Sequence, residues 1–189
     1  MRSTTVWRAH HGRPCAGEAV SLTRLARLRV PLGFGFGAVA LYLARPTWRS
    51  IAVGIVIGLC GEALRVWAAG HLEKSREVTS SGPYRYTRHP LYVGSSIMAL
   101  GLALATRSWV VGVLVAVYMI VTLTAAIRTE EAFLRERFGP EYDAYTARRA
   151  PQTDRRFSVS RAWRNREYRA LGGFALAVAL LGAKAGSPW

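Results

Sequence analysis

The segment Ser81–Gly94, SGPYRYTRHPLYVG, lies between two apolar runs and decides how the chain folds. Its opening Ser-Gly-Pro is a turn signal. Pro90 suits the first turn of a helix, where its missing N–H is no loss. The sequence therefore predicts a polar turn followed by a helix that begins near His89.

Working outward from this segment, the chain contains five apolar runs, at residues 30–44, 50–69, 91–105, 109–127 and 171–183. A membrane-spanning helix needs about 20 residues, which the second and fourth runs supply and the other three do not. Helices are expected because a lone strand would leave its backbone groups unpaired in lipid. The sequence predicts an all-α, polytopic integral membrane protein with about five transmembrane helices, of which the third and fourth form an antiparallel hairpin.

The charge pattern predicts the membrane orientation. The formal net charge of the 189 residues is +15, but the basic residues fall in blocks between apolar runs, which is typical of a membrane protein and not of a nucleic-acid-binding domain. If all five runs span, 21 of the 26 Lys and Arg residues lie on one side. The positive-inside rule then places the N-terminus, the Ser81–Gly94 segment and the long basic segment 128–169 in the cytoplasm.

Three regions are expected. Residues 1–29 form a basic cytoplasmic segment, residues 30–149 form the membrane core, and residues 150–189 form a basic segment with a final transmembrane helix. The two cysteines, Cys15 and Cys60, indicate neither a disulfide framework nor a metal site. We expect the lipid bilayer as a partner, and neither nucleic acid nor a metal ion.

Cationic groups gather where the third apolar run begins. A helix N-terminus carries partial positive charge and free N–H groups, and Arg85, Arg88 and His89 add donors beside it. Together they form a receptor for a carboxylate or a phosphate. The alternative is an interfacial belt of tyrosines with arginines reaching lipid phosphates.

Two pairs of charged residues are further candidates. Glu130 and Glu131 lie about one turn beyond the fourth run, at the same membrane boundary as His89, provided that the helix continues; an ordinary amphipathic helix with Glu–Arg pairs is the alternative. Glu62 and Arg65 share one helix face inside the second run. They form either a structural ion pair or a group in which the arginine enters the same cavity.

Two motifs in order carry a resemblance to a known family. The run GPYRYTRHPLYVG, followed about 35 residues later by EEAFLRERFGPEYDAY, resembles the isoprenylcysteine carboxyl methyltransferase family, its bacterial relatives and the wider phospholipid methyltransferase group. The resemblance covers residues 65–149 and implies an integral-membrane enzyme that uses S-adenosyl-L-methionine and releases S-adenosyl-L-homocysteine. Membrane sterol reductases, which bind NADPH, carry a similar RHP-x-Y-x-G run.

The resemblance implies a set of cofactor-binding residues. The cofactor's carboxylate, ammonium, sulfonium and adenine would be met by side chains of the two motifs and by backbone just before the turn. The residues are Val78, Thr79, Tyr84, Arg88, His89, Pro90, Tyr92 and Glu130.

The resemblance defines the residues that bind the methyl acceptor less clearly. Eukaryotic members place a substrate-contacting arginine five residues before the second glutamate, where this chain has Ala126. Arg128 is therefore a candidate for the catalytic and substrate-binding role, with Glu131 as a catalytic residue and Arg65 as a second substrate-binding residue. The family also ends soon after its FG-x-E-Y-x-x-Y run, whereas this chain continues with a basic segment and a fifth apolar run.

The function expected from these residues is O-methylation of a lipophilic carboxylate, phenol or enol that enters from the bilayer. Three alternatives stay open at this point. They are a phospholipid N-methyltransferase, a membrane NADPH-dependent sterol-type reductase, and a non-enzymatic scaffold that binds anionic lipid through its basic segments.

Overall fold

The computed structural model describes residues 33–74, 76–149, 151 and 154–186, and every regular element in these ranges is a helix. An unlabelled helix covers Gly33–Leu43. The labelled elements are α2 (Trp48–His71), the 3₁₀ helix η1 (Gly82–Arg85), α3 (Pro90–Ala105), α4 (Trp109–Phe138), α5 (Pro140–Thr146), α6 (Val159–Arg164) and α7 (Tyr168–Gly186). The chain divides into two units, residues 1–36 and 37–189, and the arrangement below is that of the second.

The all-helical prediction is confirmed. Helices cover all five apolar runs, although Val30 and the two residues after it lie outside the described residues, as does the basic segment 1–29. In the part of the chain that the structure describes, α2, α4 and α7 are long and apolar enough to cross a membrane, whereas Gly33–Leu43 and α3 are shorter. The protein is a multi-pass membrane protein with three long candidate spans, and the two shorter apolar helices cover the other runs for which a span is expected.

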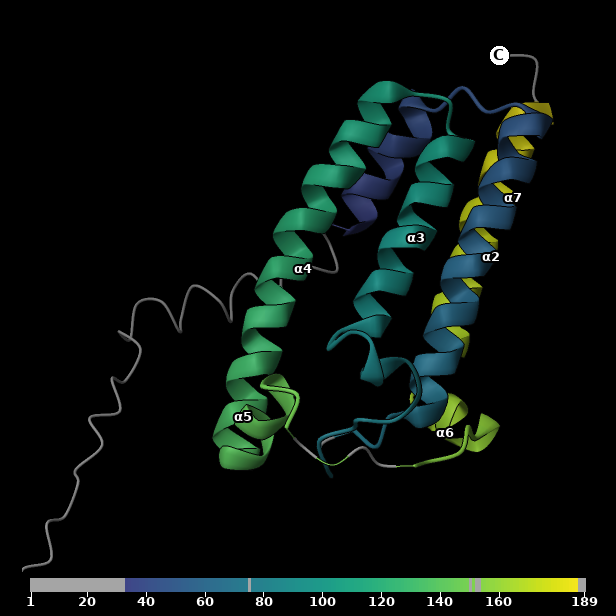
Figure 1. Ribbon diagram of the computed structural model, residues 1–189. Helices are drawn as coiled ribbons and strands as arrows, with labels where there is room; N and C mark the ends of the chain where they lie inside the picture. Colours follow the sequence, from purple (N-terminus) through teal and green to yellow (C-terminus); the bar gives the residue numbers. More distant parts are fainter. Residues whose placement is uncertain (1–32, 75, 150, 152–153, 187–189) are drawn as a thin grey trace, which may run out of the picture. The chain divides into compact units, whose positions relative to one another are not determined.

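Close packing between α2 and α3 organises these helices. Glycines from both helices meet along the contact, because a Cβ added to Gly54 would lie 2.5 Å from the carbonyl oxygen of Gly101 and one added to Gly61 would lie 2.6 Å from that of Gly94. Only helices without side chains at these positions approach so closely, which is how small residues promote helix association in lipid. In Figure 1, α3 lies between α2 and α4.

The ends of the helices away from the Ser81–Gly94 segment are joined by polar contacts. Thr47 and Ser50 form a capping box at the start of α2, and the Ser50 hydroxyl also donates to the Ala105 carbonyl at the end of α3, at 2.9 Å. The predicted α3–α4 hairpin is confirmed, with a three-residue connection in which Arg107 adopts a φ of 51°.

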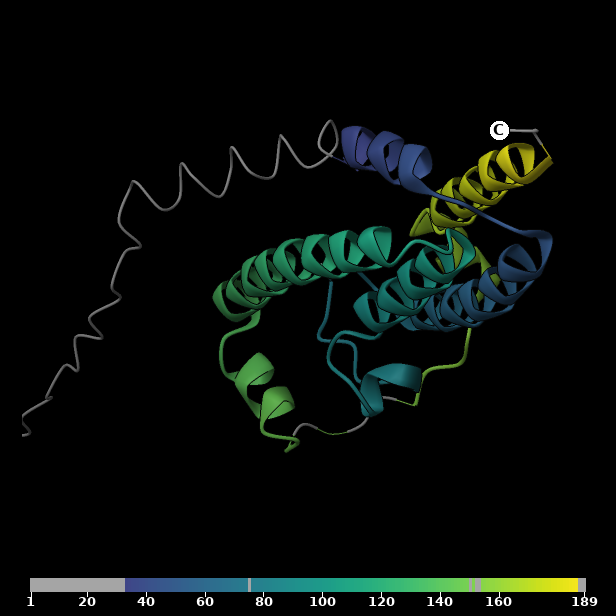
Figure 2. The same ribbon diagram turned by 90° about the horizontal axis from the view of Figure 1, so that it is seen from above.

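At the opposite ends lie the irregular segments that follow α2 and α4. Figure 1 shows the connection from α2 to α3, together with α5 and α6, at this end of the long helices. Figure 2 shows η1 beside the segment that leads to α6, where Arg85 of η1 pairs with Asp154 at 3.3 Å. The α2–α3 packing therefore places the Ser81–Gly94 segment among residues that follow it by 50 or more positions.

We expect Gly101→Ala to destabilise the protein by about 1–3 kcal/mol, the usual cost of overpacking. Its new methyl group would meet the Gly54 carbonyl oxygen at 2.6 Å and the Gly58 nitrogen at 2.7 Å. Gly112→Ala in α4 is the matched control, because no atom lies within 4 Å of its added Cβ. Thermal unfolding in detergent compares the two, and equal melting temperatures would contradict the packing argument.

Candidate functional site

The start of α3 forms one side of the site. His89 is the N-cap residue, with no side-chain hydrogen bond capping the helix, and the buried Pro90 is the first helical residue. The prediction that the helix begins near His89 is confirmed. Because no side chain caps this terminus, its partial positive charge remains directed at whatever group lies beyond it.

Residues from the end of α4 form the other side. α4 continues without a break from Trp109 to Phe138, so that the predicted extension of the helix past the apolar run is confirmed. The Tyr92 hydroxyl donates to Glu130 Oε2 at 2.6 Å, and His89 Nε2 lies 3.0 Å from Glu131 Oε1. Arg88 also reaches Glu131, at 3.4 Å. The two motifs, 38 to 42 residues apart in sequence, meet through these side chains.

Aromatic side chains cover the same region. The rings of His89 and Tyr92 stack with their centroids 5.7 Å apart. Tyr84 in η1 is buried, and burial, with a smaller contribution from the nearby Glu130 carboxylate, raises the pKa of its phenol. Tyr84 is therefore protonated at neutral pH, where its hydroxyl is a donor and its ring an apolar surface.

The short helix α5 holds Tyr84 in place. Gly139, with a φ of 48°, ends α4 and allows the chain to turn into α5. The Tyr145 hydroxyl then donates to the Tyr84 carbonyl at 3.0 Å. Burial raises the pKa of Tyr145 to about 12, so that this donor keeps its proton well above neutral pH.

The turn before α3 depends on Gly82. Its φ is 56°, a conformation that side-chain-bearing residues rarely adopt. A Cβ at this position would also lie 2.7 Å from the His71 ring, which is buried at the end of α2. Just before the turn, the buried Thr79 accepts a hydrogen bond from the Glu73 nitrogen at 3.4 Å, and Val78 is half-buried.

Arg65 lies in a network of its own. Its guanidinium pairs with Glu167 at 2.8 Å and donates to Ser95 and to the Leu91 carbonyl, with Glu62 at 3.8 Å. These contacts connect α2, α3 and the residues that precede α7. Of the two interpretations given for Glu62 and Arg65, a structural ion pair describes this arrangement. A role for Arg65 in substrate binding stays a prediction.

Arg128 occupies a different setting. It lies on α4 one turn before Glu131, its side chain is exposed, and it has no side-chain partner among the residues that the structure describes. A guanidinium in this position remains available to a negatively charged ligand, whereas Glu131 is already bound to His89 and Arg88.

Sequence reasoning missed the residues that contact the site from the C-terminal side. They come from the basic segment between α5 and α7 and are Asp154, Arg155, Arg161, Asn165 and Glu167. One signal pointed to them: Glu73 and Glu77 are the only acids between Gly70 and His89, and the arginine-rich segment is their natural counterpart.

The side chains at the start of α3 suit a ligand with charges of both signs. Arg88 and the uncapped helix terminus attract an anionic group, and Glu130 attracts a cationic one. The half-buried Tyr92 offers a ring face to a heterocycle or to a sulfonium. Among the described residues, no group of three or more His, Cys, Asp and Glu is arranged to hold a metal ion.

Comparisons with known proteins support the family resemblance that the two motifs indicate. Residues 50–141, just under half of the chain, match the family described as phospholipid methyltransferase. The match covers all but the first two residues of α2, the whole first motif and the second motif as far as Glu141 at the start of α5. The resemblance predicted from the two motifs is confirmed.

Similar proteins come from bacteria and from eukaryotes. The chain is 35% identical over 122 residues to the nickel-cobalt-cadmium resistance protein NccN of Alcaligenes xylosoxydans and 37% identical over 121 residues to the cobalt-zinc-cadmium resistance protein CzcN of Cupriavidus metallidurans. Each alignment covers 61% of this chain, which spans just over half the length of these relatives (56% and 55%).

A eukaryotic enzyme is also similar. The protein-S-isoprenylcysteine O-methyltransferase of Schizosaccharomyces pombe is 33% identical over 85 residues, which cover 45% of this chain and 36% of the enzyme. No solved structure matches the chain.

Proposed function

Because residues 50–141 relate this chain to the phospholipid methyltransferase family, we propose that it is an integral-membrane methyltransferase dependent on S-adenosyl-L-methionine. The proposed reaction is O-methylation of a lipophilic acceptor, a carboxylate or a phenol or enol. One observation carries this proposal: Tyr92 and His89 at the start of α3 bind Glu130 and Glu131 of α4, which unites the two motifs in one site.

The residues at this site fit the proposed cofactor. Arg88, His89 and the uncapped start of α3 would hold its carboxylate, and Glu130 its positively charged groups. Tyr84, Pro90 and Tyr92 would line the adenine, with the backbone at Val78 and Thr79 completing the site. When bound, the cofactor supplies an electrophilic methyl group on a sulfonium.

The remaining residues act on the acceptor. Arg128 would hold the negative charge of the acceptor oxygen and orient it for in-line attack on the methyl carbon, a transfer that depends on alignment and exclusion of water. A carboxylate acceptor is already ionised and needs no base. For a phenol or enol, Glu131 would accept the hydroxyl proton of the acceptor. His89 and Arg88 would orient the Glu131 carboxylate for this step. Arg65 would be a second residue that binds the acceptor.

A second candidate is N-methylation of a phospholipid amine, which the description of the matching family favours. For a carboxylate acceptor the two reactions are told apart by base treatment, since a methyl ester releases methanol in base and an N-methyl group does not. The names of NccN and CzcN describe metal resistance in those proteins, and no step of the proposed reaction is taken from them.

We place the site on the cytoplasmic side, with the N-terminus, from the distribution of basic residues. A cysteine in place of the exposed Lys74 and one in place of the exposed Arg107 lie at opposite ends of the helices. With Cys15 and Cys60 replaced, a membrane-impermeant maleimide added to intact cells is expected to label position 107 and not position 74. The reverse pattern would contradict the orientation.

The cofactor proposal predicts binding of S-adenosylhomocysteine to the purified protein in detergent. His89→Ala and Glu130→Ala should each weaken binding about 10-fold or more, since each removes one charge-assisted contact. Calorimetry provides the measurement, and Tyr86→Phe, which alters a side chain that is 77% exposed in the same turn, provides the control. Absence of binding to the wild type would refute the proposal.

The acceptor proposal predicts that Arg128 matters for turnover and not for cofactor affinity. Arg128→Ala should lower the rate by about 10²–10³-fold, the scale for loss of one preorganised electrostatic contact. Arg128→Lys should recover part of this, because a point charge replaces a planar fork. The assay uses radiolabelled cofactor with lipophilic carboxylic and phenolic acceptors, and undiminished turnover by Arg128→Ala would assign the acceptor to another group.

A further inference from the structure

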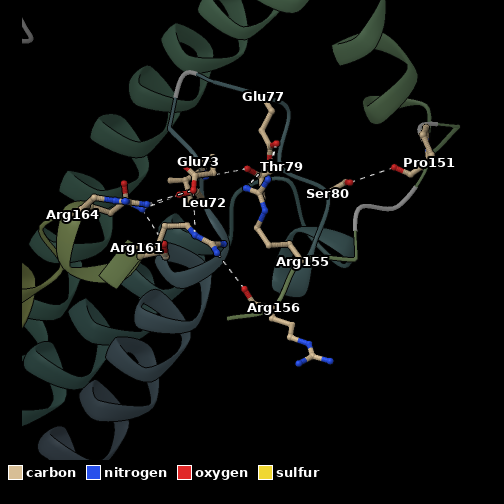
Figure 3. Close-up of polar contacts among 12 residues, drawn as sticks. Leu72, Glu73, Glu77, Thr79, Ser80, Pro151, Arg155, Arg156, Arg161 and Arg164 are labelled. Carbon is tan, nitrogen blue, oxygen red and sulfur yellow. Dashed lines mark hydrogen bonds and ion pairs between the residues drawn. The ribbon is translucent and has the colours of Figure 1, made fainter. Parts of the chain in front are cut away.

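The segment between α5 and α7 makes ordered contacts with the residues that precede α3. We call residues 154–167 the C-terminal connector and residues 73, 74 and 76–81 the motif loop. The connector contacts, in chain order, η1, the motif loop, the end of α2 and Arg65 within α2. The side chains involved in its contacts with the motif loop are drawn in Figure 3.

The tightest contact joins Arg155 to Glu77. Arg155 NH1 lies 2.6 Å from Glu77 Oε1, and NH2 donates to Glu77 Oε2 at 2.7 Å. The NH2–Oε2 contact is a charge-assisted hydrogen bond, and the NH1–Oε1 contact is an ion pair without hydrogen-bond geometry. Both side chains are largely shielded from solvent, with 22% and 33% of their surfaces exposed, so salt screens this pair less than a surface pair.

A second set of ion pairs holds the start of the motif loop. Glu73 forms ion pairs with Arg161 at 3.2 Å and with Arg164 at 3.5 Å. Glu73 also donates its backbone N–H to Thr79. Glu73 and Glu77 thus hold the irregular backbone that leads into Val78 and Thr79. Figure 3 shows both glutamates with Thr79.

The connector is itself anchored to α2 and α3. Asn165 Nδ2 donates to the carbonyls of Ala69 and Leu72 at 2.8 and 3.0 Å, which satisfies acceptors left open at the end of α2. Glu167 then pairs with Arg65, whose guanidinium donates to the Leu91 carbonyl in the first turn of α3. One continuous segment therefore holds both the motif loop and the start of α3.

We propose that the C-terminal connector positions the cofactor site, with Arg155 as the principal positioning residue acting through Glu77. Arg155 does not contact the cofactor in this proposal; it fixes the backbone at Val78 and Thr79. The inference rests on the proposed function, because it assigns that backbone to the cofactor. It gives the segment beyond the second motif a role in affinity.

The test measures S-adenosylhomocysteine affinity in three forms of the full-length protein. Arg155→Glu should raise the dissociation constant about 10-fold, since it places a carboxylate against Glu77 in a partly buried site. The exchanged pair Glu77→Arg with Arg155→Glu restores opposite charges and should return the constant to within about 3-fold of the wild type. Arg156→Glu is the matched control, because this neighbouring side chain is exposed and has no partner among the described residues.

Hydrogen exchange of the motif loop separates positioning from general destabilisation. Exchange of the motif loop should rise in Arg155→Glu while α4 and the melting temperature change little, and the exchanged pair should reverse the rise. A wild type that binds and an Arg155→Glu variant that binds equally well would overturn this inference and leave the proposed function intact. A wild type that does not bind would overturn the proposed function, and this inference with it.

Discussion

The close approach of α2 and α3 is the constraint on which the rest of the structure depends. Lipid provides no hydrophobic force between apolar helices, so the helices associate where backbones can touch. The glycines at 54, 61, 94 and 101 provide such contacts along the helix pair. With α3 fixed against α2, its first turn lies beside the end of α2, and the three-residue hairpin connection then returns α4 to the same end.

The charged residues at this end would be costly if they were left alone at a membrane boundary. Adjacent carboxylates at Glu130 and Glu131 are stabilised because they meet Tyr92 in one case and His89 with Arg88 in the other. These contacts order the site before a ligand is present, which lowers the entropy that binding must overcome. Arg128, on the same helix and exposed, is left as the group for a second ligand.

The segment beyond α5 changes how the site is held together. The described residues of the motif loop form no regular secondary structure, so side-chain contacts hold this backbone in place. Here, Arg155 and Arg161 pair with Glu77 and Glu73, and Phe157 packs so closely on Gly70 that a Cβ there would lie 2.2 Å from its ring. From the sequence alone, the basic charge of this segment suggests only a cytoplasmic location. In the structure, its arginines also form specific ion pairs.

The sequence by itself determined the helical class, the α3–α4 hairpin and the start of α3 near His89. Each of these follows from local chemistry: the length of the apolar runs, the short connection between two of them, and proline at the first helical position. It also determined that the two motifs are related, because their spacing fits one hairpin. Only the tertiary structure decided which residues pair. Arg65 binds Glu167 and Glu77 binds Arg155, across separations of 102 and 78 residues, because partners so far apart in the chain depend on how glycine-lined helices pack and not on any local pattern.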